Sequence, residues 1–209
     1  MAEIYIVAGP PRSGTSVTAG ILHNLGVHMG LGGFMLDNSG DEWNSKGHFA
    51  DREFHGFTSR YLTGLDRPRS DWIPDAEGAA QIAAMIEARA SYPKWGIKGL
   101  HSWVAARVLS RIGLDARLVV CDRPVEDSKV SFAERTGPLF KEDAPAFVED
   151  TKAAVESLWS AWSGPKLRVM YADIFDATEA TVSVVAAFCG QSVTPEALAV
   201  VDPNGRRFG

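Results

Sequence analysis

Short apolar runs alternate with stretches of helical spacing along most of the chain, and this alternation predicts an α/β protein. The apolar runs are rich in β-branched residues and end at glycine or polar positions, as buried parallel strands do. The expected strands are residues 3–8, 95–98, 117–122 and 167–172. The expected helices are residues 13–25, 49–65, 75–91, 104–112, 124–135, 144–162 and 178–189. This order favours right-handed crossovers and three layers, with a central, mostly parallel sheet flanked by helices.

Residues 28–48 interrupt the pattern, because they are rich in Gly, Asn, Asp and Ser. They predict a long loop, and long loops in compact domains are often functional. The chain of 209 residues is long enough to bury a sizeable core, and it carries no internal repeat or low-complexity segment. We therefore expect a single domain over residues 1–209.

Composition narrows the class of protein further. The net charge of −5 argues against a general nucleic-acid-binding surface, which needs a basic excess. The two cysteines, Cys121 and Cys189, lie in apolar surroundings and predict small buried side chains rather than a disulfide framework. No apolar run approaches the roughly 18 residues of a membrane helix, and the N-terminus lacks the basic segment of a leader. A cytoplasmic protein without nucleic-acid or membrane partners is the expectation.

The first expected strand runs directly into the sequence GPPRSGTS, residues 9–16, and the first helix follows. A glycine-rich loop between a strand and a helix N-terminus is a phosphate-binding P-loop, because its N–H groups and the helix end point at an anion. The fold implied is P-loop NTPase-like. The residues expected to hold the phosphate groups are Pro11, Arg12, Ser13, Gly14, Thr15 and Ser16.

This loop departs from that of a nucleoside triphosphatase, where lysine and then a hydroxyl residue follow the second glycine. Here Thr15 and Ser16 follow Gly14, and Arg12 lies inside the loop. Asp122 ends an expected strand, but Arg12 and Arg123 offer explanations for this carboxylate other than a metal, so we expect no metal site. A tight turn without a ligand is the structural alternative, and a P-loop kinase with a degenerate loop is the enzymatic one.

The segment IYIVAGPPRSGTSVTAGIL resembles the 5′-phosphosulfate loop of sulfotransferases that use 3′-phosphoadenosine 5′-phosphosulfate (PAPS). The resemblance implies that the loop binds the 5′-phosphosulfate and that Arg12 contacts the sulfonate or the bridging oxygen. It also implies that no magnesium is required. PAPS would be the co-substrate, and the acceptor a small molecule or glycan with a hydroxyl or amine.

A second motif of that family is an arginine at a strand end with a serine eight residues later, and together they hold the 3′-phosphate. In RLVVCDRPVEDSKVSF, Arg123 and Ser131 have this spacing, although Pro124 is shifted to follow the arginine directly. An arginine at the carboxyl end of a strand faces the ligand crevice of an α/β sheet, and its guanidinium suits phosphate. The alternatives are a surface or capping arginine with an incidental serine, and Ser128 as a substitute donor.

The segment WGIKGLHSW offers residues for catalysis. In the cytosolic small-molecule members a strand ends in lysine, threonine and histidine, so the resemblance implies that Lys98 touches the sulfonate and that His101 is the general base. Here His101 comes one residue late. Histidine has the right pKa for a base near neutral pH. Competing bases are His48, Asp51 and Glu53, and a solvated Lys98 at the strand end remains an alternative.

Further segments agree with the same family, each weakly. WNSKGHFAD (residues 43–51) and LRVMYADIFDATEATVSVVAAFCG (residues 167–190) resemble its recurring motifs. The tail places Arg206 or Arg207 where members close the nucleotide site, although terminal arginines are commonly solvated. The aromatic residues near the long loop are candidates to line an acceptor pocket: Trp43, Phe49, Phe54, Phe57 and Tyr61. Phe54, Phe57 and Tyr61 have helical spacing and predict plain core equally well. Two alternatives to the sulfotransferase stay open, a kinase and a non-catalytic nucleotide-binding module.

Overall fold

The structure is a computed structural model. It describes residues 2–30, 48–54, 56–57, 76–99, 102–111, 113, 115–136 and 144–205. Five strands form one sheet in the order β2-β3-β1-β4-β5, and every pairing within it is parallel. The strands are β1 (Glu3–Ala8), β2 (His28–Met29), β3 (Lys94–Lys98), β4 (Ala116–Asp122) and β5 (Lys166–Met170). The carboxyl ends of β1, β3 and β4 therefore lie side by side at one edge of the sheet.

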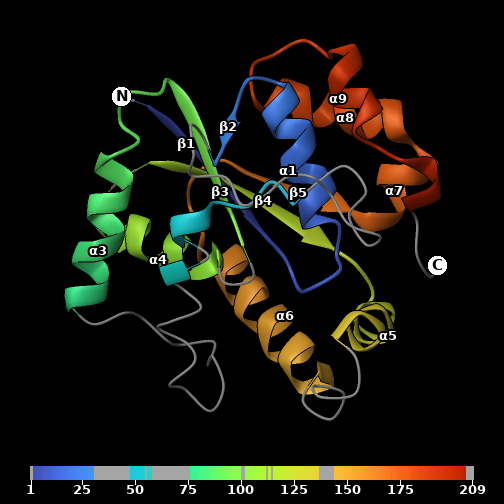
Figure 1. Cartoon of the computed structure of the whole chain (residues 1–209), viewed down its shortest axis with the longest axis horizontal. Helices are drawn as coiled ribbons and strands as arrows, with labels where there is room; N and C mark the ends of the chain where they lie inside the picture. The colour runs from blue at the N-terminus through green and yellow to red at the C-terminus, as the bar shows by residue number, and fades with distance from the viewer. Residues whose placement is uncertain are drawn as a thin grey trace.

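Helices cover both faces of the sheet, as Figure 1 shows. One layer contains α3, α4 and α6, and the other contains α1, α8 and α9. The helices are α1 (Thr15–Asn24), α3 (Ala76–Glu87), α4 (Ser102–Arg111), α5 (Val125–Thr136), α6 (Ala144–Ala161), α7 (Tyr171–Asp176), α8 (Thr178–Phe188) and α9 (Pro195–Ala199), with the 3-10 helix η2 (Pro203–Gly205). The predicted three-layer α/β fold with a parallel sheet is confirmed.

The alternation of side chains along β1 explains why its sequence is apolar after Glu3. Ile4 and Ile6 pack into the core beneath α3, α4 and α6, whereas Tyr5 and Val7 pack into the core beneath α1, α8 and α9. Successive side chains of a strand point to opposite faces, and both faces of this sheet are covered. Cys121 and Cys189 are buried, as predicted.

The structure differs from the predicted elements in several places. The two-residue strand β2 lies inside the predicted loop at residues 28–48. The sequence did not predict it, because so short a strand leaves no alternating pattern. The predicted strand 167–172 ends at Met170, and Tyr171 begins α7. Pro124 precedes α5 rather than lying in its first turn, and its carbonyl accepts the N–H of Ser128 at 3.1 Å.

Two further predictions meet the described residues only in part. Of the helix expected at residues 49–65, residues 52–54 and 56–57 are helical, and residues 49–51 precede the helix. The remaining residues of this prediction lie outside the described residues. Among the helices that the structure describes, none has the length and apolar character needed to cross a membrane.

Gly9 is the residue at which the loop leaves the sheet, and we predict that a methyl group there destabilises the protein. A Cβ at Gly9 would lie 2.5 Å from Ser13 Oγ and 2.7 Å from the main-chain oxygen of Cys121. Since the Cys121 oxygen belongs to β4, relief requires movement of the backbone. Gly9→Ala is expected to lower the free energy of unfolding by about 1–3 kcal/mol in chemical denaturation.

Gly56 provides the matched control for this prediction. A Cβ at Gly56 meets no atom of the described residues within 4 Å, and Gly56 itself is helical. Gly56→Ala is therefore expected to leave stability unchanged or to raise it by up to about 1 kcal/mol, because alanine favours the helix. Equal unfolding midpoints for the two variants would show that the close approach at Gly9 has no energetic consequence.

Candidate active site

The glycine-rich loop joins β1 to the N-terminus of α1, as the sequence predicts. Its backbone is left-handed at Arg12, with φ of 67°, and at Gly14, with φ of 92°. Such a conformation is unfavourable at a non-glycine residue such as Arg12, so surrounding contacts must hold the loop in place. Ser13 is fully buried, and its Oγ makes no hydrogen bond to any residue that the structure describes.

Lys98 reaches this loop from the end of β3. Its Nζ donates hydrogen bonds to Ser16 Oγ at 2.9 Å and to the main-chain oxygen of His48 at 3.1 Å. The residue is only 9% exposed, so the alternative of a solvated lysine is wrong. Burial, followed by the charges of Arg135 and Arg12, lowers the pKa of Lys98 to about 8. The lysine that the loop lacks is thus replaced by one from the neighbouring strand.

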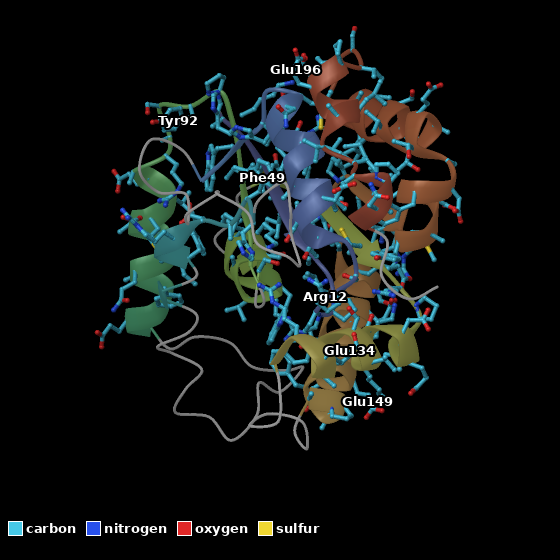
Figure 2. All side chains as sticks on the ribbon, turned by 45° about the vertical axis from the view of Figure 1, so that its right-hand side comes forward. Arg12, Phe49, Tyr92, Glu134, Glu149 and Glu196 are labelled. Carbon is cyan, nitrogen blue, oxygen red and sulfur yellow. The ribbon has the colours of Figure 1, made fainter. Side chains whose placement is uncertain are left out.

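Arg12, Arg123 and Ser131 are linked to one another, although they come from two distant segments. Arg123 Nη1 donates to the main-chain oxygen of Arg12 at 2.9 Å. Arg12 Nε in turn donates to Ser131 Oγ at 3.1 Å. Arg123 is 2% exposed, which rules out a surface arginine, and Ser131 is fully buried. The structure therefore brings the two motifs together. Figure 2 labels Arg12 on the side of the molecule where α5 runs.

Tyr171 is a residue of this site that the sequence reasoning missed. The Cζ atom of Arg123 lies 4.0 Å from the centroid of the Tyr171 ring, a cation–π contact. Tyr171 also flanks the loop, because a Cβ at Gly14 would lie 3.2 Å from its ring. The run LRVMYA continued the strand pattern and hid the start of α7. Ser128 is buried as well, and its Oγ has no hydrogen-bond partner among the described residues.

The two acidic candidates for the general base, Asp51 and Glu53, both bind Arg89. Asp51 Oδ2 lies 2.7 Å from Arg89 Nη2, and both side chains are almost fully buried. Asp51 Oδ1 accepts the N–H groups of Glu53 and Phe54, as an N-cap does. Glu53 Oε2 lies 3.0 Å from Arg89 Nη2. Asp51 thus caps the helix, and both carboxylates neutralise a buried guanidinium, whereas His48 contributes its main-chain oxygen to Lys98.

Asp122, at the end of β4, pairs with cations other than those we expected. It binds Lys152 and Arg168, the latter at 2.6 Å, rather than Arg12 or Arg123. Burial alone would raise the pKa of Asp122, but its hydrogen bonds to Lys152 and Arg168 and their charges outweigh burial and lower it. Within the described ranges, no group of three His, Cys, Asp or Glu side chains is placed to hold a metal ion.

The remaining candidates divide into core residues and residues without a described position. Phe49, Phe54 and Phe57 are buried in the two hydrophobic cores, so the alternative of plain core is confirmed for Phe54 and Phe57. The other candidates lie outside the described residues: Trp43, Tyr61, His101, Arg206 and Arg207.

The sheet order and the loop after β1 define the class of fold. A parallel sheet with a phosphate loop between its first strand and a helix is the P-loop fold. Comparison with solved structures narrows the class of fold further. The sulfotransferase domain of the Synechococcus PCC 7002 olefin synthase is 18% identical, with a TM-score of 0.56 over 95% of this chain and 76% of that chain. The fold of this protein is that of the sulfotransferases.

Two more structures support the same conclusion. Sulfotransferase STF1 from Mycobacterium tuberculosis H37Rv has a TM-score of 0.54 at 15% identity, over 96% of this chain and 70% of that chain. The sulfotransferase domain from the curacin biosynthetic pathway has a TM-score of 0.54 at 14% identity, over 96% of this chain and 78% of that chain. No family model and no curated protein matches the sequence.

Proposed function

We propose that the protein is a PAPS-dependent sulfotransferase that acts on a hydroxyl or amine of a small-molecule or glycan acceptor. The observation that carries the proposal is the link of Arg12 to Ser131 and Arg123. It joins the loop suited to a 5′-phosphosulfate to the pair suited to a 3′-phosphate. A nucleotide with phosphate groups at both positions matches this arrangement.

The residues present fit such a nucleotide. Gly9 and Gly14 let the backbone approach an anion, and the N–H groups at the start of α1 point toward it. The buried hydroxyls of Ser13 and Ser128 make no hydrogen bond within the described part of the chain, which is unusual for buried polar groups and suits a polar ligand. Arg12, Lys98 and Arg123 supply positive charge around the loop.

The kinase alternative is disfavoured by the contact between Lys98 and Ser16. Ser16 occupies the position whose hydroxyl holds magnesium in P-loop nucleoside triphosphatases. Here that hydroxyl accepts a hydrogen bond from the Lys98 ammonium at 2.9 Å. The hydroxyl at the metal position is therefore already bound to a cation of the protein itself, which favours a metal-independent reaction.

The chemistry is an in-line displacement at sulfur. The acceptor oxygen or nitrogen loses its proton to a general base and forms a bond to sulfur, and the bond from sulfur to the bridging phosphate oxygen breaks. 3′-Phosphoadenosine 5′-phosphate (PAP) leaves with the electron pair. Lys98 and Arg12 stabilise the charge that moves onto the sulfonate and bridging oxygens.

The general base of our proposal is His101, three residues after Lys98, with His48 as the second candidate. The acidic candidates rank lower because Arg89 already binds both carboxylates. Transfer of labelled sulfate from PAPS to a panel of hydroxyl and amine acceptors distinguishes the histidines. His101→Ala should abolish transfer while PAP still binds, and an unimpaired His101→Ala enzyme would move the assignment to His48.

Isothermal titration with PAP tests the nucleotide specificity. We expect PAP to bind without metal and to bind equally well in the presence of a chelator. ATP with magnesium is the comparison ligand. No binding of PAP at high micromolar concentration, or tight binding of ATP that depends on magnesium, would overturn the proposal in favour of the kinase. PAP binding without sulfate transfer to any acceptor would favour the alternative of a non-catalytic nucleotide-binding module.

Lys98 makes PAPS binding dependent on pH. In the free protein, burial and the charges of Arg135 and Arg12 lower the pKa of Lys98 to about 8, so its proton is lost above that pH. An anion favours the charged form and raises the pKa again in the complex. Affinity should therefore be constant below pH 8 and fall above it, and the Kd for PAPS is expected to be about tenfold higher at pH 9 than at pH 7.

Lys98→Arg is the control, since a guanidinium stays protonated throughout this range. The variant should bind PAPS with no pH dependence between pH 7 and 9. Titration in buffers of different ionisation enthalpy should detect proton uptake near pH 9 in the original protein only. A pH dependence that survives in Lys98→Arg would assign it to another group.

A further inference from the structure

Phe49 shares an unusual backbone conformation with Arg12 of the phosphate loop. In the part of the chain that the structure describes, these are the two residues other than glycine with a left-handed backbone, and φ is 48° at Phe49. Such a conformation is unfavourable for a residue with a Cβ, and residues held in it are concentrated at functional sites. The conformation of Phe49 therefore points to a role in the site.

The ring of Phe49 is fixed against α1. Phe49 is buried, and its ring centroid lies 5.6 Å from that of His23. A Cβ at Gly20 would lie 2.8 Å from Cε2 of Phe49, so the absence of a side chain at Gly20 makes room for the ring. Gly20 and His23 are three residues apart and share one face of the helix. Figure 2 labels Phe49 beside α1.

The peptide that joins His48 to Phe49 meets Lys98. The main-chain oxygen of His48 accepts a hydrogen bond from Lys98 Nζ at 3.1 Å. Because φ is the rotation about the N–Cα bond of Phe49, it sets the direction of this carbonyl once the ring is fixed. The left-handed conformation of Phe49 is thus the one that brings the carbonyl to the ammonium.

The contacts of the Lys98 ammonium leave one of its N–H groups for a ligand. A lysine ammonium has three N–H donors, and Lys98 uses two of them for Ser16 Oγ and the main-chain oxygen of His48. Together these two contacts fix the rotation of the ammonium about its Cε–Nζ bond. The third N–H has no acceptor among the described residues.

We propose that Phe49 is a positioning residue for Lys98: it holds the His48 carbonyl on the ammonium, which then presents its third N–H to the sulfonate of PAPS. The inference rests on the proposed function and extends it to a residue that neither nucleotide motif includes. Phe49 acts through Lys98, so its loss should affect binding of the sulfonate and not binding of the two phosphate groups.

Titration calorimetry with PAP and PAPS tests the role of Phe49 without knowledge of the acceptor. PAP and PAPS share both phosphate positions, and only PAPS has the sulfonate. Phe49→Ala is expected to raise the Kd for PAPS about fivefold to tenfold, because one charge-assisted hydrogen bond loses its geometry, and to change the Kd for PAP less than twofold. Unchanged PAP binding also shows that the variant folds. Phe49→Leu keeps part of the contact with α1, so its Kd for PAPS should be intermediate, and it replaces Phe49→Ala if that variant does not fold.

The pH at which PAPS affinity falls is a second readout, which a loss of stability alone does not move. Burial, then the charges of Arg135 and Arg12, lower the pKa of Lys98 to about 8, and the nearby Cys121 thiol acts in the opposite direction. The His48 carbonyl favours the charged ammonium, so losing this contact lowers the pKa further. In the alanine variant the fall in PAPS affinity should therefore begin about one pH unit lower than in the original protein.

Phe57→Ala is the matched control, since it removes a ring of the same size from a nearby position in the sequence. Phe57 is buried in the other hydrophobic core, beneath α3, α4 and α6. Its replacement should lower stability but change neither the ratio of the two Kd values nor the pH dependence. Equal weakening of PAP and PAPS by Phe49→Ala, no effect on either, or the same PAPS-specific loss in Phe57→Ala would overturn the inference. Failure of the original protein to bind PAP would instead overturn the proposed function.

Discussion

Arg123→Ala is expected to raise the Kd for PAP by about a hundredfold or more. The variant loses the guanidinium proposed for the 3′-phosphate, and charge-assisted hydrogen bonds contribute about 1.5–3 kcal/mol each. It also loses the hydrogen bond from Arg123 Nη1 to the main-chain oxygen of Arg12, where the loop has its left-handed φ of 67°. The loop is then less firmly held, so binding at the 5′ end weakens as well. Two such effects together correspond to a factor of a hundred at about 1.4 kcal/mol per factor of ten.

Arg117→Ala provides the control for this prediction. Arg117 is also on β4, but it lies at the other end of the strand and binds Glu3 at 3.2 Å. Its replacement should leave the Kd for PAP unchanged. Ser131→Ala should weaken binding by about fivefold to tenfold, since it removes one neutral hydroxyl, which also accepts the hydrogen bond of Arg12 Nε. A change of less than fivefold for Arg123→Ala, with the fold intact by circular dichroism, would contradict the role of Arg123.

The parts of the site that the sequence predicts are those fixed by local pattern. The run of residues 4–8 is apolar and buried because both faces of β1 are covered, and the glycine spacing of the loop follows it directly. Arg123 could be placed at a strand end because RLVVC is similarly continuous. Parallel strands then bring their carboxyl ends to one edge, which is why two motifs more than a hundred residues apart meet.

The parts that the sequence does not predict depend on pairings between distant segments. The contact of Lys98 with Ser16 requires that β3 lies beside β1, and the strand order becomes known only from the structure. The pairing of Asp51 with Arg89 joins residues 38 positions apart that share no motif. The helical spacing of Phe54 and Phe57 fits a pocket wall and a core equally well, because both require one apolar face.

Asp51 is the residue for which a structural role and a catalytic role predict opposite results. Its carboxylate is 1% exposed, binds Arg89 and caps the helix at residues 52–54 and 56–57. Burial raises the pKa of Asp51, and the hydrogen bonds and the Arg89 charge act against this rise. Removing one member of a buried ion pair leaves the other charge without compensation. Asp51→Ala is therefore expected to lower the free energy of unfolding by about 3–5 kcal/mol in chemical denaturation.

A double-mutant cycle separates the ion pair from the other contacts of Asp51. Arg89→Met alone leaves a buried carboxylate and should destabilise the protein by a similar amount. Asp51→Ala combined with Arg89→Met removes both charges, so its loss should be clearly smaller than the sum of the single losses. Glu53→Gln should change stability by less than about 1 kcal/mol, since Glu53 is 42% exposed. A catalytic base would behave differently: Asp51→Asn would keep stability and PAP binding but lose sulfate transfer, and that result would refute the structural role.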